Sequence, residues 1–364
     1  MRGIVFADGK AEITDDLEVR APGPAEVKVR IVAAGVCHSD ISVINGTIPW
    51  PSPSVLGHEG AGIVEEVGEE VSRVKPGDHV VITTLANCGM CRHCNTGKPT
   101  WCRQSMGNMT KPFTVRGEPA FNFAATSAFS EMTVVKEIQV VPIDKEVPLQ
   151  AACLIGCAVV TGVGAVFNRA NVPRGATAAV WGVGGVGLNV IQALAIAGAS
   201  RVIALDTVVA KEALARKFGA TDFIDGGAED APAQIRALLP GDAPGVFNTG
   251  GVDWAFDCVG HPEIMRTAIE ALDWGGTCVI IGVPAFGTQL SAPVALLNHV
   301  DRAIMGCRYG SIRPHADIPL IVDLYLEGRL KLDELVSQTY PLEGFESAMS
   351  DMHEGKLARG VLTF

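Results

Sequence analysis

The chain of 364 residues is longer than a single hydrophobic core normally organises, so its length predicts two domains. Hydrophobic residues make up 48% of it and charged residues 19%, which excludes a disordered chain. The net charge of −11 and the absence of any run of Lys and Arg argue against nucleic-acid binding. We therefore expect an acidic globular protein without a nucleic-acid partner.

No apolar stretch of the sequence indicates a membrane protein. The N-terminal stretch MRGIVFADGKAEI is not a signal peptide, because Asp8 follows a very short apolar run. The longest weakly polar run, residues 151–167, contains Thr161 and three glycines and is short for a membrane span. We expect a buried helix and turn there, and no membrane partner. The expected location is the cytoplasm, where thiols stay reduced and disulfides are rare.

The first part of the chain, up to about residue 150, alternates short β segments with Gly and Pro turns. Its β-branched residues predict strands at 26–32, 60–67, 78–85 and 131–141. From about residue 160, predicted strands alternate with predicted helices, which implies a parallel, doubly wound sheet. Strands are expected from residue 178 and at 201–206, 222–225, 252–260 and 277–283, and helices at 188–199, 211–220 and 261–272.

After residue 307 the alternation ends, and helices expected at 318–328 and 342–355 precede a last strand at 360–364. The predicted fold class is α/β. A β-rich domain of residues 1–158 and 308–364 is interrupted by a Rossmann domain of residues 159–307.

Four of the ten cysteines lie close together in the sequence with the spacing C-x2-C-x2-C-x7-C: Cys88, Cys91, Cys94 and Cys102. Tetrahedral zinc takes four ligands at about 2.3 Å, and short loops let one small lobe enclose the ion. Four thiolates leave no open position, so the motif predicts a structural zinc site. Unligated thiols and a redox C-x-x-C are disfavoured, because crowded exposed thiols oxidise easily and no βαβ pattern surrounds the motif.

A second set of possible zinc ligands is Cys37, His58 and Cys157. Cys37 and His58 lie in glycine-flanked turns, and such a pair alone is more often ordinary buried residues. With Cys157 they form the ligand set of a catalytic zinc, which keeps a fourth position for water or substrate. Asp40 and Glu59 flank these residues and could orient them, although each alone is more often a solvated carboxylate.

The segment WGVGGVG, residues 181–187, places a G-x-G-x-x-G motif between a predicted strand and a predicted helix. Gly182, Gly184 and Gly187 allow a tight turn, close approach of a pyrophosphate and helix–strand packing. The phosphates would meet the helix N-terminus. Asp206 ends the next strand, where a carboxylate accepts hydrogen bonds from a ribose and repels a 2′-phosphate. This pattern predicts NAD rather than NADP.

Together these motifs resemble the zinc-dependent alcohol dehydrogenases of the medium-chain dehydrogenase/reductase superfamily, over essentially the whole chain. GHEGAGIVEEVG, VKPGDHV, the four-cysteine segment, GCAVVTG, GVGGVG, IIGVP and RGVLTF occur in family order. The long segment between Cys102 and Cys157 is typical of the dimeric members. The resemblance implies a GroES-like catalytic domain beside the Rossmann domain, a homodimer, NAD, and two zinc ions per chain, one catalytic and one structural.

The resemblance also implies a role for individual residues. Cys37, His58 and Cys157 bind catalytic zinc with Glu59 behind it, and Ser39 takes the proton of the alcohol. The expected catalytic residues are Ser39, Asp40 and Glu59. The expected cofactor-binding residues are His38, Thr161, Gly182, Val183, Gly184, Gly185, Val186, Gly187, Asp206, Lys211, Ile281, Val283 and Arg359. The expected reaction is reversible hydride transfer between a small-molecule alcohol and NAD, giving an aldehyde or ketone.

Among the cofactor-binding residues, Asp206 and Lys211 are expected at the adenosine ribose. His38 and Arg359 are expected to reach the pyrophosphate. Ile281 is one of two residues expected near the nicotinamide, the other being Val283. Except for Asp206, these assignments come from the resemblance alone.

Some positions depart from the family pattern. Ser42 replaces a histidine that ends the proton relay in many relatives, so the proton outlet would run through water. Glutathione-dependent formaldehyde dehydrogenases carry an acidic residue in place of Ile48 and an arginine in place of Met106, and the absence of both disfavours action on that thiol adduct. Thr84 replaces a bulky aromatic residue of some relatives. We expect Ile48 and Thr84 in a substrate pocket with room for bulky or aryl alcohols.

Two further alternatives stay open. The protein could be a nicotinoprotein, in which NAD remains bound and an external acceptor regenerates it. It could also be a zinc-lobe binding protein with a degenerate catalytic half, although the intact ligand set and dinucleotide motif argue against this. The sequence does not name the substrate.

Overall fold

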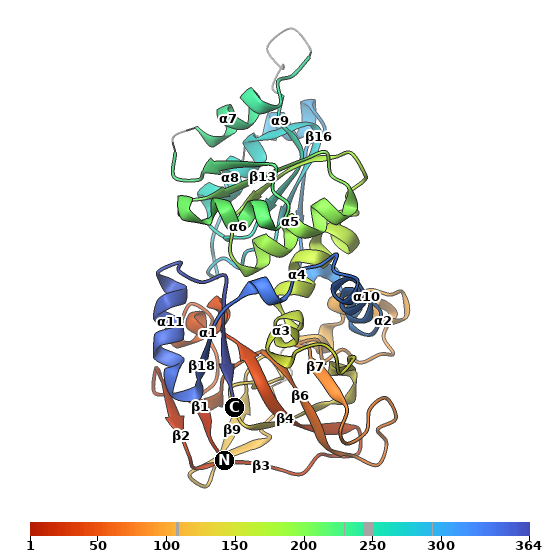
Figure 1. Ribbon diagram of the computed structural model, residues 1–364, viewed down its shortest axis with the longest axis vertical. Helices are drawn as coiled ribbons and strands as arrows, with labels where there is room; N and C mark the ends of the chain where they lie inside the picture. Colours follow the sequence, from red (N-terminus) through yellow and green to blue (C-terminus); the bar gives the residue numbers. More distant parts are fainter. Residues whose placement is uncertain (107–108, 229, 243–249, 293) are drawn as a thin grey trace. The chain divides into compact units, whose positions relative to one another are not determined.

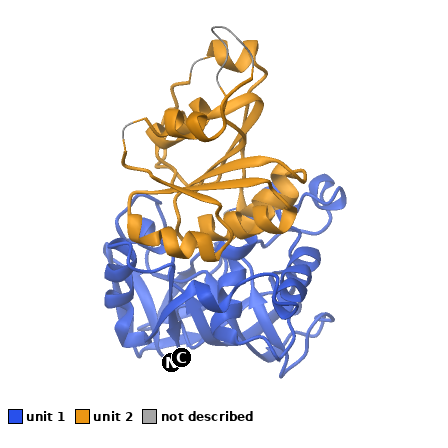
Figure 2. Cartoon of the chain, turned by 45° about the horizontal axis from the view of Figure 1, so that its top comes forward, with its two compact units in different colours: residues 1–160, 312–364 blue, residues 161–311 orange. Residues whose placement is uncertain are grey.

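The computed structural model describes residues 1–106, 109–228, 230–242, 250–292 and 294–364 (Figure 1). The chain forms two compact units (Figure 2). Unit 1 comprises residues 1–160 and 312–364, and unit 2 comprises residues 161–311. Unit 2 is therefore an insertion in unit 1, which the chain leaves once and re-enters once.

A seven-stranded sheet organises unit 1, in the order β11-β7-β6-β4-β19-β18 with β10 also paired to β4. Its long strand β4 turns Val27, Val29 and Ile31 into the core and alternates them with Lys28 and Arg30, as an amphipathic strand does. The strands of this sheet are β4 (Glu26–Gly35), β6 (Glu59–Val67), β7 (His79–Ile82), β10 (Met132–Lys136), β11 (Val140–Pro142), β18 (Val336–Pro341) and β19 (Arg359–Thr363).

A six-stranded sheet, in the order β2-β1-β5-β9-β8-β3, completes the β structure of unit 1. Its strands are β1 (Gly3–Ala7), β2 (Lys10–Thr14), β3 (Leu17–Val19), β5 (Ser54–Val55), β8 (Phe113–Val115) and β9 (Glu118–Asn122). The helices of unit 1 are α1 (His38–Ile44), α2 (Arg92–Asn95), α3 (Leu149–Ala152), α10 (Pro314–Leu326) and α11 (Phe345–His353), while α4 (Ala158–Gly164) begins in unit 1 and ends in unit 2. The predicted β-rich domain is thus confirmed.

Unit 2 contains a parallel six-stranded sheet in the order β14-β13-β12-β15-β16-β17. The strand order reverses between β12 and β15, and the carboxyl ends of the strands at such a point are where sheets of this kind bind ligands. The strands are β12 (Thr177–Trp181), β13 (Arg201–Asp206), β14 (Asp222–Asp225), β15 (Val252–Asp257), β16 (Leu272–Ile280) and β17 (Ala303–Gly306). The helices are α5 (Gly185–Ala197), α6 (Glu212–Lys217), α7 (Ala231–Leu238), α8 (Pro262–Glu270) and α9 (Val294–His299). The predicted doubly wound parallel sheet is confirmed.

Short 3₁₀ turns and one π-helical segment join these elements. The 3₁₀ turns are η1 (Pro99–Trp101), η2 (Arg103–Ser105), η3 (Glu137–Gln139), η4 (Cys153–Gly156), η6 (Val209–Lys211), η7 (Tyr309–Ser311), η8 (Asp333–Leu335) and η9 (Leu342–Gly344), and the π-helix is η5 (Ala165–Ala170). Of the helices in the described ranges, none is by itself long and apolar enough to cross a bilayer, and only the bent pair at 149–156 and 158–170 reaches that length and composition together.

Most predicted elements differ from the structure by a few residues at their ends, and three of the differences have a clear physical reason. The single strand expected at 131–141 is β10 and β11, because the buried amide of Gln139 in η3 donates to the carbonyls of Thr83 and Ala125 at 2.9 and 3.0 Å. The strand expected to continue to residue 260 ends at Asp257, whose carboxylate accepts the Val259 and Gly260 N–H groups in a turn.

The helix expected from residue 318 begins instead at Pro314, at the first helical position, where its missing N–H is tolerated. Pro319 therefore lies inside α10. The short elements α7, α9 and β17 were not predicted from the sequence, because apolar periodicity is weak over segments this short.

Candidate active site and cofactor site

Three segments of unit 1 bring Cys37, His58 and Cys157 together. Strands β4 and β6 pair with Gly35 opposite Glu59, which sets Cys37 and His58 at neighbouring ends of one sheet. Cys157 follows η4, which lies so close to the sheet that a side chain at Gly156 would collide with the carbonyl of Ile82. The glycine at this position therefore permits the close approach. One ligand atom from each of Cys37, His58, Glu59 and Cys157 lies within 4.8 Å of the others. The predicted trio therefore forms a cluster in the structure, and as the candidate for the catalytic role it is called the catalytic cluster from here on.

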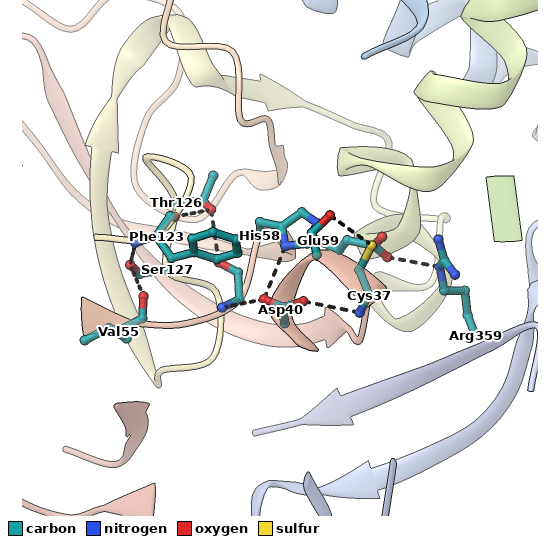
Figure 3. Close-up of polar contacts among 11 residues, drawn as sticks. Cys37, Asp40, Val55, His58, Glu59, Phe123, Thr126, Ser127 and Arg359 are labelled. Atoms are coloured by element: carbon teal, nitrogen blue, oxygen red, sulfur yellow. Dashed lines mark hydrogen bonds and ion pairs between the residues drawn. The ribbon is translucent and has the colours of Figure 1, made fainter. Parts of the chain in front are cut away.

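The buried carboxylate of Asp40 braces this cluster (Figure 3). Its Oδ2 accepts the Cys37 N–H at 3.2 Å, and its Oδ1 accepts the Gly57 N–H at 3.1 Å and lies 3.3 Å from Nδ1 of His58. A hydrogen bond from Nδ1 leaves Nε2 of the imidazole to bind an ion. Burial lowers the pKa of His58, but the charges of Asp40 and Cys37 outweigh it and raise the pKa well above its ordinary value. The negative charges of Asp40 and Cys37 thus favour a cation next to the imidazole.

Glu59 and Arg359 form a buried pair beside the thiols (Figure 3). Nε of Arg359 lies 3.6 Å from Oε2 of Glu59, and both side chains are almost fully buried. Among the described residues, neither carboxylate oxygen of Glu59 finds a hydrogen-bond donor. Burial raises the pKa of Glu59 to about 8, against the opposing effect of Arg359. An unsatisfied carboxylate next to two thiols and an imidazole fits a divalent cation at this position.

The other residues predicted for chemistry or substrate binding lie around the cluster in different ways. Ser39 is partly buried in the first turn of α1, and its Oγ lies 3.9 Å from Sγ of Cys37. His38, next to it, is exposed. Ile48 packs against the main apolar core of unit 1, and Thr84 is partly buried just after β7. Of these four, Ser39 has a contact with Cys37 of the catalytic cluster.

The four-cysteine segment folds into a lobe whose thiols converge. The Sγ atoms of Cys91 and Cys94 lie 3.6 Å apart, those of Cys88 and Cys102 3.6 Å apart, and those of Cys88 and Cys94 4.0 Å apart. Four sulfurs at about 2.3 Å from one zinc ion would be about 3.8 Å apart. Backbone N–H groups of Met90 and Cys91 lower the pKa of Cys88 to about 6, which favours the thiolate that zinc binds. The geometry fits zinc, and all four thiols are free of disulfides.

In unit 2, the glycine motif turns the chain from β12 into α5. Gly182 has φ +91°, a conformation that favours glycine, and a side chain at Gly187 would collide with the Gly182 carbonyl. Gly184 faces open space, where a side chain would block an approaching ligand. This cradle at the start of a 13-residue helix fits a pyrophosphate. Val259, which sequence analysis missed, lies against Gly182 across the turn.

Asp206 ends β13 beside this cradle. Its carboxylate accepts the Val183 N–H at 2.8 Å and the Val208 N–H at 2.9 Å, and it pairs with Nζ of Lys211 at 3.0 Å. The carboxylate is therefore fixed in direction at the carboxyl edge of the sheet. Of the residues expected near the nicotinamide, Ile281 is buried just beyond β16 and Val283 is 69% exposed.

The remaining predicted cofactor residues have varied surroundings. Thr161 is almost buried, while Gly185 and Val186 form the first turn of α5. Arg359, expected at the pyrophosphate, is buried and contacts Glu59 in unit 1. That contact joins residues far apart in the chain and has no local sequence signal. Sequence analysis also missed Phe123, which packs on His58 from the segment FNFAATS, where nothing in the sequence indicates a metal site.

Comparisons with known proteins agree with this geometry. Residues 23–145 match the family model of the alcohol dehydrogenase GroES-like domain, and residues 185–327 match that of the zinc-binding dehydrogenases. The S-(hydroxymethyl)glutathione dehydrogenase of Saccharomyces cerevisiae is 40% identical over 98% of this chain and 95% of its own. The class-3 alcohol dehydrogenase of Zea mays is 38% identical over 99% of this chain and 95% of its own.

A solved structure extends the likeness to three dimensions. Benzyl alcohol dehydrogenase from Acinetobacter calcoaceticus is 32% identical and superimposes with a TM-score of 0.92, covering 100% of this chain and 99% of its own. The fold and the two cysteine clusters define a zinc-binding oxidoreductase. The chain belongs to the zinc-dependent alcohol dehydrogenase family of the medium-chain dehydrogenase/reductase superfamily.

Proposed function

We propose that this protein is a zinc- and NAD-dependent dehydrogenase that interconverts bulky or aryl alcohols with their aldehydes or ketones. The observation that carries the proposal is the catalytic cluster. Cys37, His58 and Cys157 supply three zinc ligands with a fourth position left for substrate, and the unsatisfied carboxylate of Glu59 lies behind them. A structural site with four thiolates in the same unit leaves the catalytic role to this cluster.

The residues around the catalytic cluster would divide the work of the reaction. A zinc ion held there would supply the positive charge that eases loss of a proton from an alcohol, and NAD would supply the hydride acceptor. Ser39 would take the proton, because its hydroxyl lies beside Cys37. Asp40 would hold His58 in the correct tautomer, and Glu59 would balance the charge of the ion against Arg359.

NAD is proposed over NADP because of Asp206. Its fixed carboxylate would accept hydrogen bonds from the adenosine ribose, with Lys211 beside it, and would repel a 2′-phosphate. His38 and Arg359 remain proposed for the pyrophosphate, and the glycine motif for its cradle. Asp206→Ala should weaken the binding of NAD and reduce the ratio of kcat/KM with NAD to kcat/KM with NADP. An unchanged NAD/NADP ratio would contradict the assignment of Asp206.

The substrate class rests on three side chains and one neighbour. The relative from Saccharomyces cerevisiae is named for S-(hydroxymethyl)glutathione, but apolar Ile48 and Met106 stand where the resemblance requires charged groups for such a substrate. Thr84 is small where some relatives carry a bulky ring. The structural neighbour named for benzyl alcohol therefore indicates the better substrate class.

The proposed assembly is a homodimer. We propose no nucleic-acid or membrane partner for it. Strand β17 forms an edge of the parallel sheet in unit 2, and edge strands pair readily with a second copy. The segment between β16 and β17 exposes Val283, Phe286 and Val294, apolar side chains that an interface would cover. We further propose the cytoplasm as the location, because the ten cysteines are all free thiols.

An alcohol panel assayed by NADH absorbance tests the proposal, with zinc content measured on the same sample. We expect two zinc ions per chain and the highest kcat/KM on benzyl alcohol and related substrates. S-(hydroxymethyl)glutathione serves as the competing substrate and should be oxidised poorly. NAD that stays with the protein through gel filtration, with turnover only when an external acceptor is added, would identify a nicotinoprotein instead.

A further inference from the structure

Two aromatic side chains stand in a row against the imidazole of His58. The ring of Phe123 meets that imidazole edge to face, with centroids 5.4 Å apart and planes at 89° (Figure 3). Trp50 meets Phe123 in the same way, with centroids 5.1 Å apart and planes at 89°. Edge-to-face contact is a favoured geometry for aromatic pairs. Each ring in the row therefore restrains the rotation of the next.

Hydrogen bonds fix the backbone of Phe123 to the segment that carries His58. The Phe123 N–H donates to the hydroxyl of Ser127 at 3.0 Å, and this hydroxyl donates to the Val55 carbonyl at 2.8 Å (Figure 3). The hydroxyl of Thr126 donates to the Gly57 carbonyl at 3.1 Å. These bonds fix where the side chain of Phe123 begins. They do not fix the rotation of its ring, which depends on the contacts of the ring itself.

Trp50 approaches this ring from a stiff segment. Its indole N–H donates to the carbonyl of Asn122, the residue before Phe123, at 3.1 Å. Pro49 and Pro51 flank Trp50 and limit the backbone conformations open to it. The indole is also partly buried against the main apolar core of unit 1, which includes Phe123. One hydrogen bond, two prolines and this packing therefore hold the indole in place against Phe123.

We propose that Trp50 is a positioning residue for His58 and acts through Phe123. Asp40 sets the direction of the imidazole within its plane through Nδ1, and Phe123 resists rotation of that plane. The second restraint is only as firm as the ring of Phe123, which Trp50 holds. The orientation of the imidazole decides how well its other nitrogen points at a metal ion. The inference rests on the proposed role of His58 as a zinc ligand and on no choice of substrate.

Three variants separate positioning from general packing. Trp50→Leu removes the ring, and Trp50→Phe keeps a ring but loses the indole N–H. Phe345→Leu is the matched control, because Phe345 forms an edge-to-face pair with Phe129 at 5.5 Å in the same apolar core, whereas the ring pair that His58 forms among the described residues is with Phe123. Should Trp50→Leu fail to fold, Trp50→Met fills more of the same space and takes its place in the comparison.

The readout is the metal site itself. Zinc is replaced by Co²⁺, and the visible spectrum is recorded without coenzyme or alcohol, together with the rate of zinc loss to a chelator. Trp50→Leu should shift the cobalt bands and speed the loss of one of the two zinc ions by roughly tenfold, the low end for residues that orient a ligand. Trp50→Phe should stay near the wild type. Phe345→Leu should lower the melting temperature and leave the bands unchanged.

Kinetics complete the test. Trp50→Leu should lower kcat by a similar factor for ethanol and for benzyl alcohol, because a misdirected ligand affects both. Unchanged cobalt bands with a KM altered only for benzyl alcohol would overturn the inference and make Trp50 a wall of the substrate pocket. Equal band shifts in Phe345→Leu would overturn it in favour of a loosened core. A wild-type protein that binds no metal would instead refute the proposed function.

Discussion

The two cysteine clusters of unit 1 hold similar donor atoms in opposite surroundings. The lobe draws Cys88, Cys91, Cys94 and Cys102 from one short segment of the chain, and three of these four thiols are partly exposed. The catalytic cluster draws Cys37, His58 and Cys157 from three distant segments, and a buried carboxylate on each side supports it. The same chemistry is thus built locally in one place and by the tertiary fold in the other.

This contrast indicates how much metal binding would contribute to folding stability at each cluster. In the lobe, short turns bring together four thiols, three of them partly exposed, so an ion bound there would stabilise the fold directly. In the catalytic cluster, the pairing of strands β4 and β6 and the hydrogen bond from Cys37 to the carboxylate of Asp40 fix the ligands through contacts of their own. Removing a ligand should therefore cost stability in the lobe and chemistry in the catalytic cluster.

The largest expected effect comes from Cys157→Ser. Losing one ligand of the catalytic cluster removes several kcal/mol of charge stabilisation, so kcat/KM should fall by roughly 10³-fold or more. The melting temperature should change little, since the sheet sets the position of the site. Zinc content should fall from two ions to one. Cys153→Ser, at a buried thiol outside both clusters, is the control and should keep both ions. Full activity with one zinc lost would reverse the roles of the two clusters.

Cys88→Ser should show the opposite pattern. The variant opens the closed lobe, and the free energy of unfolding should fall by roughly 3 kcal/mol or more, as for other losses of a metal site. For the fraction that remains folded, kcat should stay close to the wild-type value. Thermal unfolding followed by circular dichroism, with zinc counted before and after, measures both quantities. A variant that keeps its zinc and its melting temperature would show that the lobe is not a zinc site.

The same contrast explains how much the sequence could predict. Four thiols in one short segment must lie close together whatever the fold, so the lobe was predictable from spacing. Cys157 lies far beyond His58 in the chain, so before the structure only their residue types and then the family resemblance joined them, and spacing did not. The contact of Arg359 with Glu59 and the row from Trp50 to Phe123 depend on tertiary packing and leave no periodic trace.

The fold divides in the same way. The parallel sheet of unit 2 was predictable, because strands and helices that alternate carry distinct periodicities. The break between β10 and β11 was not, since it depends on buried bonds from Gln139 to carbonyls far away in sequence. Apolar periodicity predicts which face of an element is buried. It does not predict a hydrogen bond from a buried side chain to a carbonyl far away in the sequence.

Ser39→Ala separates the loss of a proton acceptor from the loss of a metal ligand. It removes only the proposed proton acceptor and leaves the ligands of the catalytic cluster intact. Its hydroxyl is the group 3.9 Å from the sulfur of Cys37. We expect kcat to fall by roughly 10²-fold, the usual scale for a positioned proton acceptor. Zinc content and melting temperature should match the wild type. A kcat within the error of the wild type would mean that another group takes the proton.

The smallest expected effects concern the outlet of that proton. Ser42 stands where many relatives carry a histidine, and a serine hydroxyl does not titrate near neutral pH. Ser42→Ala should therefore be mild, and the dependence of kcat on pH should not report an imidazole. Exposed His38, next to Ser39, is the alternative base.

His38→Gln separates the two possibilities. If His38 binds the pyrophosphate, losing one charge-assisted hydrogen bond should raise the dissociation constant of NAD by about tenfold. The dependence of kcat on pH should then keep its wild-type shape, because the group that titrates is elsewhere. The dissociation constant is measured by fluorescence titration with NADH, and kcat across about pH 5 to 10, the range over which such groups change charge. If kcat of His38→Gln no longer depends on pH and its NAD affinity is unchanged, His38 is the base and Ser39 does not accept the proton.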